Sequence, residues 1–409
     1  MKKDFCIKTR LACIAVTLAA VSLLGCQQWE PEELHTRTTL FYAAADNDLS
    51  SPIMNNIRDM AAGMDDVTSA GNNMLAFVDR PNVNSVLLSI HNGRIDTVKV
   101  WPENLHSSSP EVLSMVIKET RALYPSSDRF NLIISSHGTG WVPASTLPFI
   151  DPYQYPLPVG AAAQNSLAPL QHFNTKATCV EVTPDNKMKW MDLDGLKSAI
   201  PDGMFDFIMF DACLMGSAEV AYALKDKADW MIVSEVEIMK TGFPYSRIMS
   251  DMFQGNYGEI CRKYYEYYDS RSGNSRTGGI ALVNLGKMEN LAKAFASVVS
   301  SATVSVDKLD IYRGVQRCDR YEHPVMFDLY STVQSLKPSS IAMADFEAAM
   351  LDCISDCYHT DYVENELKLE IYSGLNCYIP SPLYEGKINQ FFADTEWNKA
   401  TGFYSPDKR

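Results

Sequence analysis

The sequence lacks an excess of basic residues: 36 lysines and arginines stand against 50 aspartates and glutamates, and the formal net charge is -14 at pH 7. Nucleic-acid-binding proteins need a basic surface, so this balance argues against nucleic acid as a partner. It is compatible with attraction of cationic ligands. The chain also lacks internal repeats and low-complexity tracts. Hydrophobic content of 46% and charged content of 21% are typical of an ordinary globular protein.

The chain also lacks a hydrophobic run long enough for a comfortable membrane span, which needs about 20 residues. The apolar run 11–24 has the length of a secretory signal core and follows a basic start. It ends in LLGC, which resembles a bacterial lipobox with Cys26 as the acylated residue. We therefore expect residues 1–25 to be a lipoprotein signal peptide and 26–37 a tether, with the exported protein lipid-anchored to a bacterial membrane, periplasmic or at the cell surface. An ordinary secretory signal and a buried N-terminal helix are the alternatives.

The ten cysteines lack the regular spacing of a disulfide framework, and a chain of 409 residues does not need one. Export permits disulfides without requiring them. Cys353, Cys357 and His359 superficially resemble part of a zinc site, but no second ligand pair follows at a suitable distance. We expect Cys353 and Cys357 to lie on one face of a helix, and we expect no tightly bound catalytic metal.

Apolar strands alternate with helices along the first half of the chain. This order predicts an α/β fold with a mostly parallel sheet covered by helices on both faces. In such sheets, functional sites gather beyond the carboxyl ends of the strands. A hairpin with a loop longer than two residues is expected around Asn92 and Gly93. The predicted strands are 38–45, 73–80, 130–136, 205–211 and 230–235, and the predicted helices include 50–60 and 110–123.

Two changes of pattern suggest how the chain is divided. Residues 141–190 show no clear core strand and are interpreted as an insertion. We therefore expect a catalytic core over 38–245 that contains this insertion. After it, aromatic-rich helices predict a mixed α/β C-terminal subdomain over 246–409. Within that part we expect a strand at 278–285, helices at 257–268, 287–299 and 343–358, and a closing strand at 368–380.

His137 and Cys213 each follow a buried strand, so both side chains are expected at the same edge of the sheet. A histidine titrates near neutral pH and can hold a cysteine as the nucleophilic thiolate. The backbone N–H groups of Gly138 and Cys213 could form an oxyanion hole. A helix beginning near Leu214 would place its positive end at the sulfur. Taken singly, each residue has a simpler reading: the cysteine as a small buried hydrophobe, the histidine as a turn residue.

Asp211 lies two residues before Cys213, on the same side of the strand if the strand extends that far. A carboxylate next to a thiol raises the thiol's pKa and opposes thiolate formation unless a cation compensates. The alternative is that Asp211 caps the following helix or is hydrogen-bonded within the sheet.

The blocks around the histidine and the cysteine, SSHGTGW and FDACLMGSAEVAYALKDKADWMIVSE, resemble those of clostripain-like cysteine peptidases. That family is grouped with caspases, gingipains and legumain. The resemblance extends to FYAAADNDLSS, GFPY and YSGLNCYIP and so covers most of residues 38–380. It implies a caspase-like fold in which His137 is the catalytic histidine and Cys213 the nucleophile.

The resemblance also implies a specificity. In this peptidase group the residue two before the cysteine lines the S1 pocket, and clostripain-like enzymes cut after Arg or Lys. Asp211 is then the principal S1 residue. Asp46, Asn47 and Asp48 are expected near the same edge, either shaping the pocket or capping the following helix. Two further acids, Glu235 and Glu237, are weaker S1 candidates.

Family members are often zymogens that are cleaved at a basic residue between the histidine and the cysteine. Here Lys176, Lys187 and Lys189 lie in that interval, and each could equally belong to a solvated loop. Some members respond to calcium, which stays a possible activator. We expect a monomeric endopeptidase acting on proteins or peptides without a cofactor. An inactive surface binding protein and a different cysteine amidohydrolase are the alternative functions.

Overall fold

The computed structural model describes residues 36–143, 146, 178–182, 188–384 and 388–406. The predicted signal peptide, Cys26, Lys176 and Lys187 lie outside these residues. Within the described ranges, no helix is both long and apolar enough to cross a membrane. The cysteines in these ranges are all free thiols.

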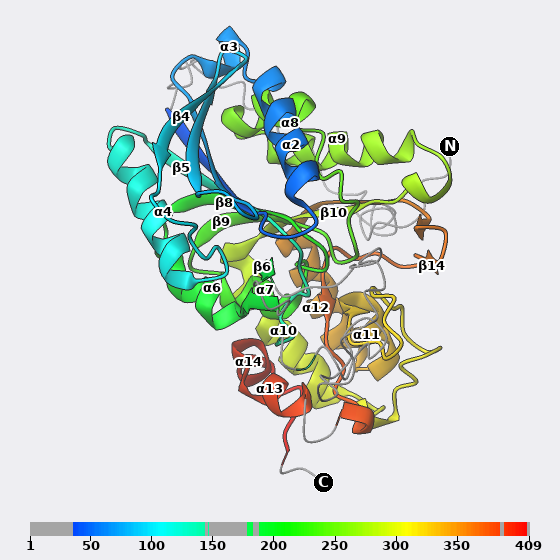
Figure 1. Ribbon diagram of the computed structural model, residues 1–409. Helices are drawn as coiled ribbons and strands as arrows, with labels where there is room; N and C mark the ends of the chain where they lie inside the picture. The colour runs from blue at the N-terminus through cyan, green and yellow to red at the C-terminus, as the bar shows by residue number, and fades with distance from the viewer. Residues whose placement is uncertain (1–35, 144–145, 147–177, 183–187, 385–387, 407–409) are drawn as a thin grey trace, which may run out of the picture.

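A nine-stranded sheet forms the centre of the molecule (Figure 1). The five strands in its middle are parallel, and two antiparallel strands extend it at each side. This confirms the predicted mostly parallel α/β sheet. The strands, in spatial order, are β12 (Ile354–His359), β10 (Gly279–Asn284), β9 (Ala228–Val233), β8 (Phe205–Asp211), β5 (Arg129–Ser135), β1 (Arg37–Ala44), β2 (Asn73–Asp79), β3 (Val86–His91) and β4 (Arg94–Val100).

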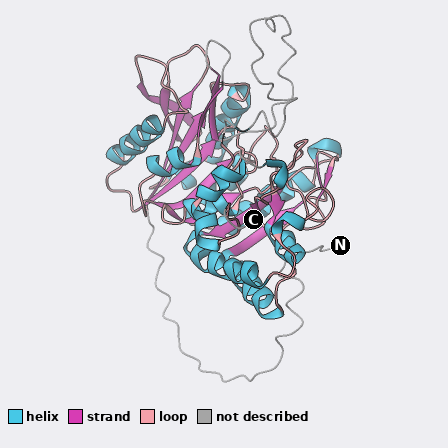
Figure 2. Cartoon of the chain, turned by 90° about the horizontal axis from the view of Figure 1, so that it is seen from below, coloured by secondary structure: helices cyan, strands magenta, loops and turns pink. Residues whose placement is uncertain are grey.

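Helices cover both faces of this sheet, and each face has its own hydrophobic core (Figures 1 and 2). Side chains alternate along a strand, so Leu40 and Tyr42 of β1 enter one core while Phe41 and Ala43 enter the other. One face is covered by α2 (Ser50–Gly63), α8 (Tyr245–Gln254) and α9 (Tyr257–Asp269). The other is covered by α4 (Pro110–Leu123), α6 (Leu193–Ala199), α7 (Ala218–Ala223), α10 (Met288–Ser301) and α12 (Ser340–Cys353).

The remaining elements are short or lie around this core. They are α3 (Asp66–Ser69), β6 (Thr178–Val182), β7 (Met188–Met191), β11 (Phe327–Asp328), α11 (Leu329–Leu336), β13 (Tyr362–Val363), β14 (Leu367–Lys368), β15 (Asn376–Cys377), α13 (Ile388–Asp394) and α14 (Glu396–Thr401), besides short 3-10 turns.

The C-terminal part of the chain continues the central sheet, because β10 and β12 both pair into it. The predicted division at residue 245 therefore does not coincide with a boundary between sheets. The helix predicted over 343–358 ends at Cys353, and Cys357 lies on β12, so the two cysteines do not share a helix face. Of the predicted closing strand 368–380, only Lys368, at the end of β14, and the two residues of β15 lie in strands.

The hairpin between β3 and β4 is tighter than predicted. His91 pairs directly with Arg94, which leaves a two-residue loop. Asn92 and Gly93 have φ angles of 46° and 73°, the left-handed values that a type I′ turn requires. The prediction of a longer loop was wrong because β4 begins earlier than the apolar pattern indicates.

Candidate active site

A cavity of about 80 Å³ lies at the carboxyl ends of β5, β8 and β9. His137 follows β5 and Cys213 follows β8 by two residues each, and both line this cavity with Asp211. The two strands are paired so that Ser135 lies opposite Asp211. His137 is 4% exposed and Cys213 is 7% exposed. The parallel register thus brings the predicted catalytic pair and the predicted specificity residue into one enclosed space.

The chain turns sharply after Cys213. Leu214 has a φ of 60°, a strained value for a side chain of this size. Its N–H donates to the Val236 carbonyl at 3.0 Å, which anchors the turn to the segment after β9. Helix α7 begins only at Ala218. The expectation of a helix N-terminus at the sulfur was therefore wrong, and a helix dipole does not account for activation of Cys213.

The Cys213 thiol donates a hydrogen bond to the Ile238 carbonyl, with Sγ and O separated by 3.6 Å. Ile238, Met239 and Lys240 form the wall of the cavity that follows β9. This contact directs the sulfur toward that wall.

His137 has an acidic partner. Its Nε2 lies 2.6 Å from Oδ1 of Asp48, a residue of the loop between β1 and α2 that also lines the cavity. Within the described ranges, no other side chain forms a hydrogen bond or ion pair with the His137 ring. The contact joins the loop after β1 to the segment after β5 at this cavity.

Gly138 lies against the backbone of the cysteine turn. A Cβ atom at this position would stand 2.5 Å from the Cys213 carbonyl oxygen and 3.1 Å from the Ala212 Cβ. Real Cβ atoms do not approach backbone so closely, so only glycine fits here. The close approach holds the histidine loop and the cysteine loop together.

Asp211 is 6% exposed and lies within a polar cluster at the cavity. Three side chains direct a donor to its Oδ2: Tyr245 at 2.9 Å, Ser135 at 3.3 Å and Asn56 at 3.5 Å. Among the described residues, none donates a hydrogen bond to Oδ1. Burial raises the pKa of this carboxyl to about 6, although the hydrogen bonds from Tyr245 and Ser135 lower it. Oδ2 is thus held by three donors of the protein, and Oδ1 accepts none from the described residues.

The structure does not bring Asp46 and Asn47 to this cavity. The Asn47 amide donates to the carbonyls of Ala44 and Val180, and its oxygen accepts the Leu49 N–H. The Asp46 carbonyl accepts the Val182 N–H at 2.9 Å. Both residues shape the loop that carries Asp48, so the predicted S1 contacts of Asp46 and Asn47 lack support in this geometry. No side-chain hydrogen bond caps α2.

The weaker candidates also lie elsewhere. Glu235 is fully buried beneath the cysteine turn, and its pKa is raised by burial. Glu237 forms an ion pair with Arg320, with Oε2 and Nε separated by 2.5 Å. Lys189, the one predicted processing site within the described ranges, is exposed on β7.

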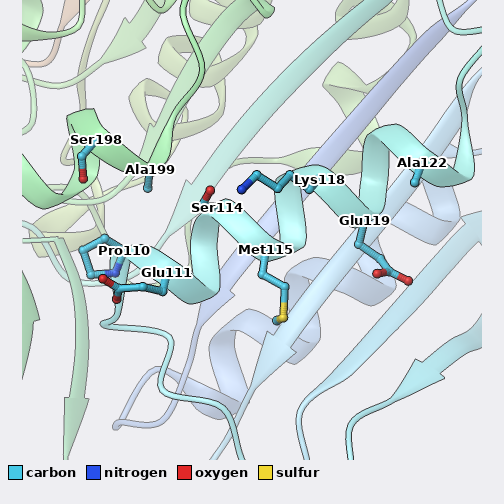
Figure 3. A pocket seen from close by; sticks show the side chains of 9 residues that line it. All are labelled: Pro110, Glu111, Ser114, Met115, Lys118, Glu119, Ala122, Ser198 and Ala199. Carbon is cyan, nitrogen blue, oxygen red and sulfur yellow. The ribbon is translucent and has the colours of Figure 1, made fainter.

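A larger groove of about 650 Å³ lies between α4 and α6 (Figure 3). Its lining contains no cysteine or histidine, and so lacks the nucleophile and base of the smaller cavity. It is lined by Pro110, Glu111, Ser114, Met115, Lys118, Glu119, Ala122, Ser198 and Ala199.

Sequence reasoning did not assign Asp48 to His137, nor Asn56, Ser135 and Tyr245 to Asp211. The sequence did contain an indication for Ser135. It lies two residues before His137, as Asp211 lies two residues before Cys213, and the parallel pairing of β5 and β8 places the two residues opposite each other. Tyr245 lay in the quoted GFPY element without a role. Asn56 is a helical residue far from the site in sequence and gave no local signal.

A histidine and a cysteine at neighbouring carboxyl ends of a parallel sheet, sharing one cavity, define an α/β cysteine hydrolase. The sequence profile of the clostripain family matches residues 41–150 and 165–395. The chain therefore belongs to the clostripain family of cysteine proteases.

Individual relatives agree with this assignment. Clostripain from Hathewaya histolytica is 28% identical over 252 residues, which are 53% of this chain and 42% of that protein; the chain thus spans less than half of this relative. The structure of an inactive zymogen C11 protease from Parabacteroides distasonis superposes with a TM-score of 0.74, at 26% identity, over 91% of this chain and 99% of that chain. A secreted C11 cysteine protease from Bacteroides thetaiotaomicron, 23% identical over 90% of this chain and 99% of that one, shares the fold with a TM-score of 0.73.

Proposed function

We propose that this protein is a cysteine endopeptidase that cleaves after Arg or Lys. The observation that carries the proposal is the shared cavity of His137, Cys213 and Asp211. A thiol, a base and a buried carboxylate in one enclosed space supply a nucleophile, a proton carrier and a binding site for a cation.

In the proposed reaction, His137 accepts the Cys213 proton and the thiolate attacks the scissile carbonyl carbon. The N–H groups of Gly138 and Cys213 donate to the resulting oxyanion. His137 then protonates the leaving amine as the C–N bond breaks, which leaves an acyl thioester. Water activated by His137 hydrolyses the thioester and restores the thiol. No metal or other cofactor takes part in these steps, and calcium enters only as a possible activator.

The specificity for Arg or Lys rests on Asp211. Its Oδ2 is held by three donors from the protein, while Oδ1 receives none from the described residues. A substrate ammonium or guanidinium would pair with Oδ1 and stabilise the ionised carboxylate. The same cation would offset the repulsion between this carboxylate and the Cys213 thiolate.

The proposal also covers export, lipid attachment and proteolytic activation of the protein. We infer that the protein is exported, and a relative described as secreted supports this. We further infer that a lipid on Cys26 is its only attachment to the membrane and that it acts as a monomer. Self-cleavage at Lys176, Lys187 or Lys189 would activate the enzyme, as expected if this chain, like its relative described as a zymogen, is made inactive. Mass spectrometry of the mature protein would reveal both the lipid and the cut.

The proposed peptidase activity is tested with fluorogenic peptides that end in Arg, Lys or Asp. We expect cleavage after Arg or Lys by the wild type and none by Cys213→Ala. Absence of cleavage by the wild type would favour an inactive surface binding protein. Cleavage that survives in Cys213→Ala would rule out the proposed nucleophile, and activity only on other amides would favour a different cysteine amidohydrolase.

A further inference from the structure

We propose that Asp48 positions His137 and makes the catalytic group a triad of Cys213, His137 and Asp48. The proposal rests on the proposed peptidase function and adds a residue to it. It starts from the separation of 2.6 Å between Asp48 Oδ1 and His137 Nε2. Both residues line the cavity that also holds Cys213.

The contact determines which ring nitrogen of His137 carries the hydrogen and which has the free lone pair. An ionised carboxylate can only accept hydrogen bonds, so Nε2 must carry a hydrogen and donate it to Asp48. In the neutral ring, the lone pair is then on Nδ1. Nδ1 is therefore the atom that takes the Cys213 proton and later returns it to the leaving amine.

The loop that carries Asp48 is anchored on its preceding side. The Asn47 amide donates to Ala44 in β1 and to Val180 in β6, and the Asn47 oxygen accepts the Leu49 N–H across Asp48. These bonds restrict where the Asp48 carboxylate can lie. Residues that orient a catalytic group are effective when their own geometry is fixed in this way.

The charge of Asp48 also affects the reaction. When His137 accepts the thiol proton it becomes an imidazolium, and a carboxylate at hydrogen-bond distance stabilises that cation. The Asp48 side chain is 33% exposed, so water screens part of this attraction. We therefore expect a smaller effect than that of a fully buried triad aspartate.

The test compares Asp48→Asn with the wild type. With a peptide ending in lysine, kcat should fall on the order of 10- to 100-fold while KM changes little, because the variant loses orientation and charge at the proton carrier. Iodoacetamide, which is small and uncharged, gives a second readout through the alkylation rate of Cys213 as a function of pH. The rise of that rate with pH should move to higher pH in Asp48→Asn, because the thiolate then forms beside an imidazolium that has lost its stabilising partner.

The chain offers a matched control. His91 and Asp96 form a second histidine–carboxylate pair, 3.0 Å apart, in the β3–β4 hairpin away from the cavity. Asp96→Asn makes the same chemical change there and should leave both readouts as in the wild type. The other titratable groups at the cavity, Asp211, Cys213, Lys240 and Glu364, are the same in both variants.

Three results would overturn the triad. One is wild-type kinetics in Asp48→Asn. Another is a raised KM with unchanged kcat and an unchanged alkylation profile, which would make Asp48 a substrate-binding residue. The third concerns Asp48→Glu, which keeps the charge: a kcat no higher than that of Asp48→Asn. If the wild type cleaves no peptide, the proposed function fails, but the alkylation profile still decides the role of Asp48.

Discussion

The Tyr245 hydroxyl donates a hydrogen bond of 2.9 Å to Asp211 Oδ2. This contact joins the start of α8 to the end of β8, and it occupies one of the two oxygens of the carboxylate that we assign to substrate binding. A buried carboxylate with one oxygen that accepts no hydrogen bond from the described residues is suited to receive one cationic group.

Asp211→Asn should lower kcat/KM for peptides ending in Arg or Lys by about 100-fold or more, since a buried cation would lose its charged partner. The alkylation rate of Cys213 by iodoacetamide should change far less, because this reagent has no cation. Parallel kinetics with the peptides and the reagent check the prediction. Equal losses in both would show that Asp211 acts on the cysteine or on folding rather than on the substrate.

Tyr245→Phe should shift the acid limb of kcat/KM to higher pH by about one unit, because a hydrogen bond to a charged group contributes about 1.5 kcal/mol. Asp211 has a pKa of about 6 and must be ionised to bind a cation, so wild-type activity should decline as pH falls through about 6. Loss of the Tyr245 donor raises that pKa further. The measurement is the pH profile of kcat/KM for a lysine peptide.

Tyr264→Phe is the matched control for this profile. The Tyr264 hydroxyl is buried in the same aromatic cluster, and no partner for it exists among the described residues. Its removal should leave the acid limb in place. An equal shift in both variants would attribute the effect to packing and not to the hydrogen bond.

Gly138→Ala should abolish activity and lower the thermal midpoint, because the new Cβ would stand 2.5 Å from the Cys213 carbonyl oxygen. The two loops would have to separate. Gly286→Ala is a suitable control, since its nearest contact would be the Asn284 side chain at 3.3 Å. Thermal unfolding and peptide cleavage of both variants test this, and an active Gly138→Ala enzyme would contradict the close approach.

Stability should decrease as pH rises from about 4 to about 7. Burial is the largest cause of the raised pKa values of six carboxyl groups. The folded protein therefore binds protons at these groups more tightly than the unfolded chain does. The stability that this contributes is lost as pH rises through the pKa values of the folded protein. Thermal midpoints at constant ionic strength should be higher near pH 5 than near pH 8, and a flat or rising trend would contradict this. The groups are Asp79, Asp211, Asp319 and Asp328, with pKa values of about 6, and Glu219 and Glu237, with values of about 7.

The parts of the site that could be predicted from the sequence are those that local pattern determines. His137 and Cys213 each follow a buried strand. Their placement at one edge of the sheet could be predicted from the rule that sites gather at the carboxyl ends of parallel strands. The alternation of side chains along a strand gave the side on which Asp211 lies. The order of strands and helices likewise predicted the sheet, while the family resemblance supplied the caspase-like interpretation and the roles of the residues.

The remaining parts depend on contacts between distant segments. Asp46, Asn47 and Asp48 are consecutive polar residues in a loop without periodicity, so their sequence does not reveal which one faces the cavity. That choice depends on the bond from Asn47 to Val180, which lies 133 residues later. Tyr245 and Asn56 reach Asp211 from helices on one face of the sheet, which no local pattern indicates.

The central claim is that Cys213 is the nucleophile and that Asp211 selects a basic residue beside it. An irreversible peptide inhibitor ending in lysine, followed by mass spectrometry of the labelled protein, tests both parts directly. We expect one label on Cys213 in the wild type, none in Cys213→Ala, and markedly slower labelling in Asp211→Asn. A label on another residue, or equal labelling rates in the wild type and Asp211→Asn, would contradict the account.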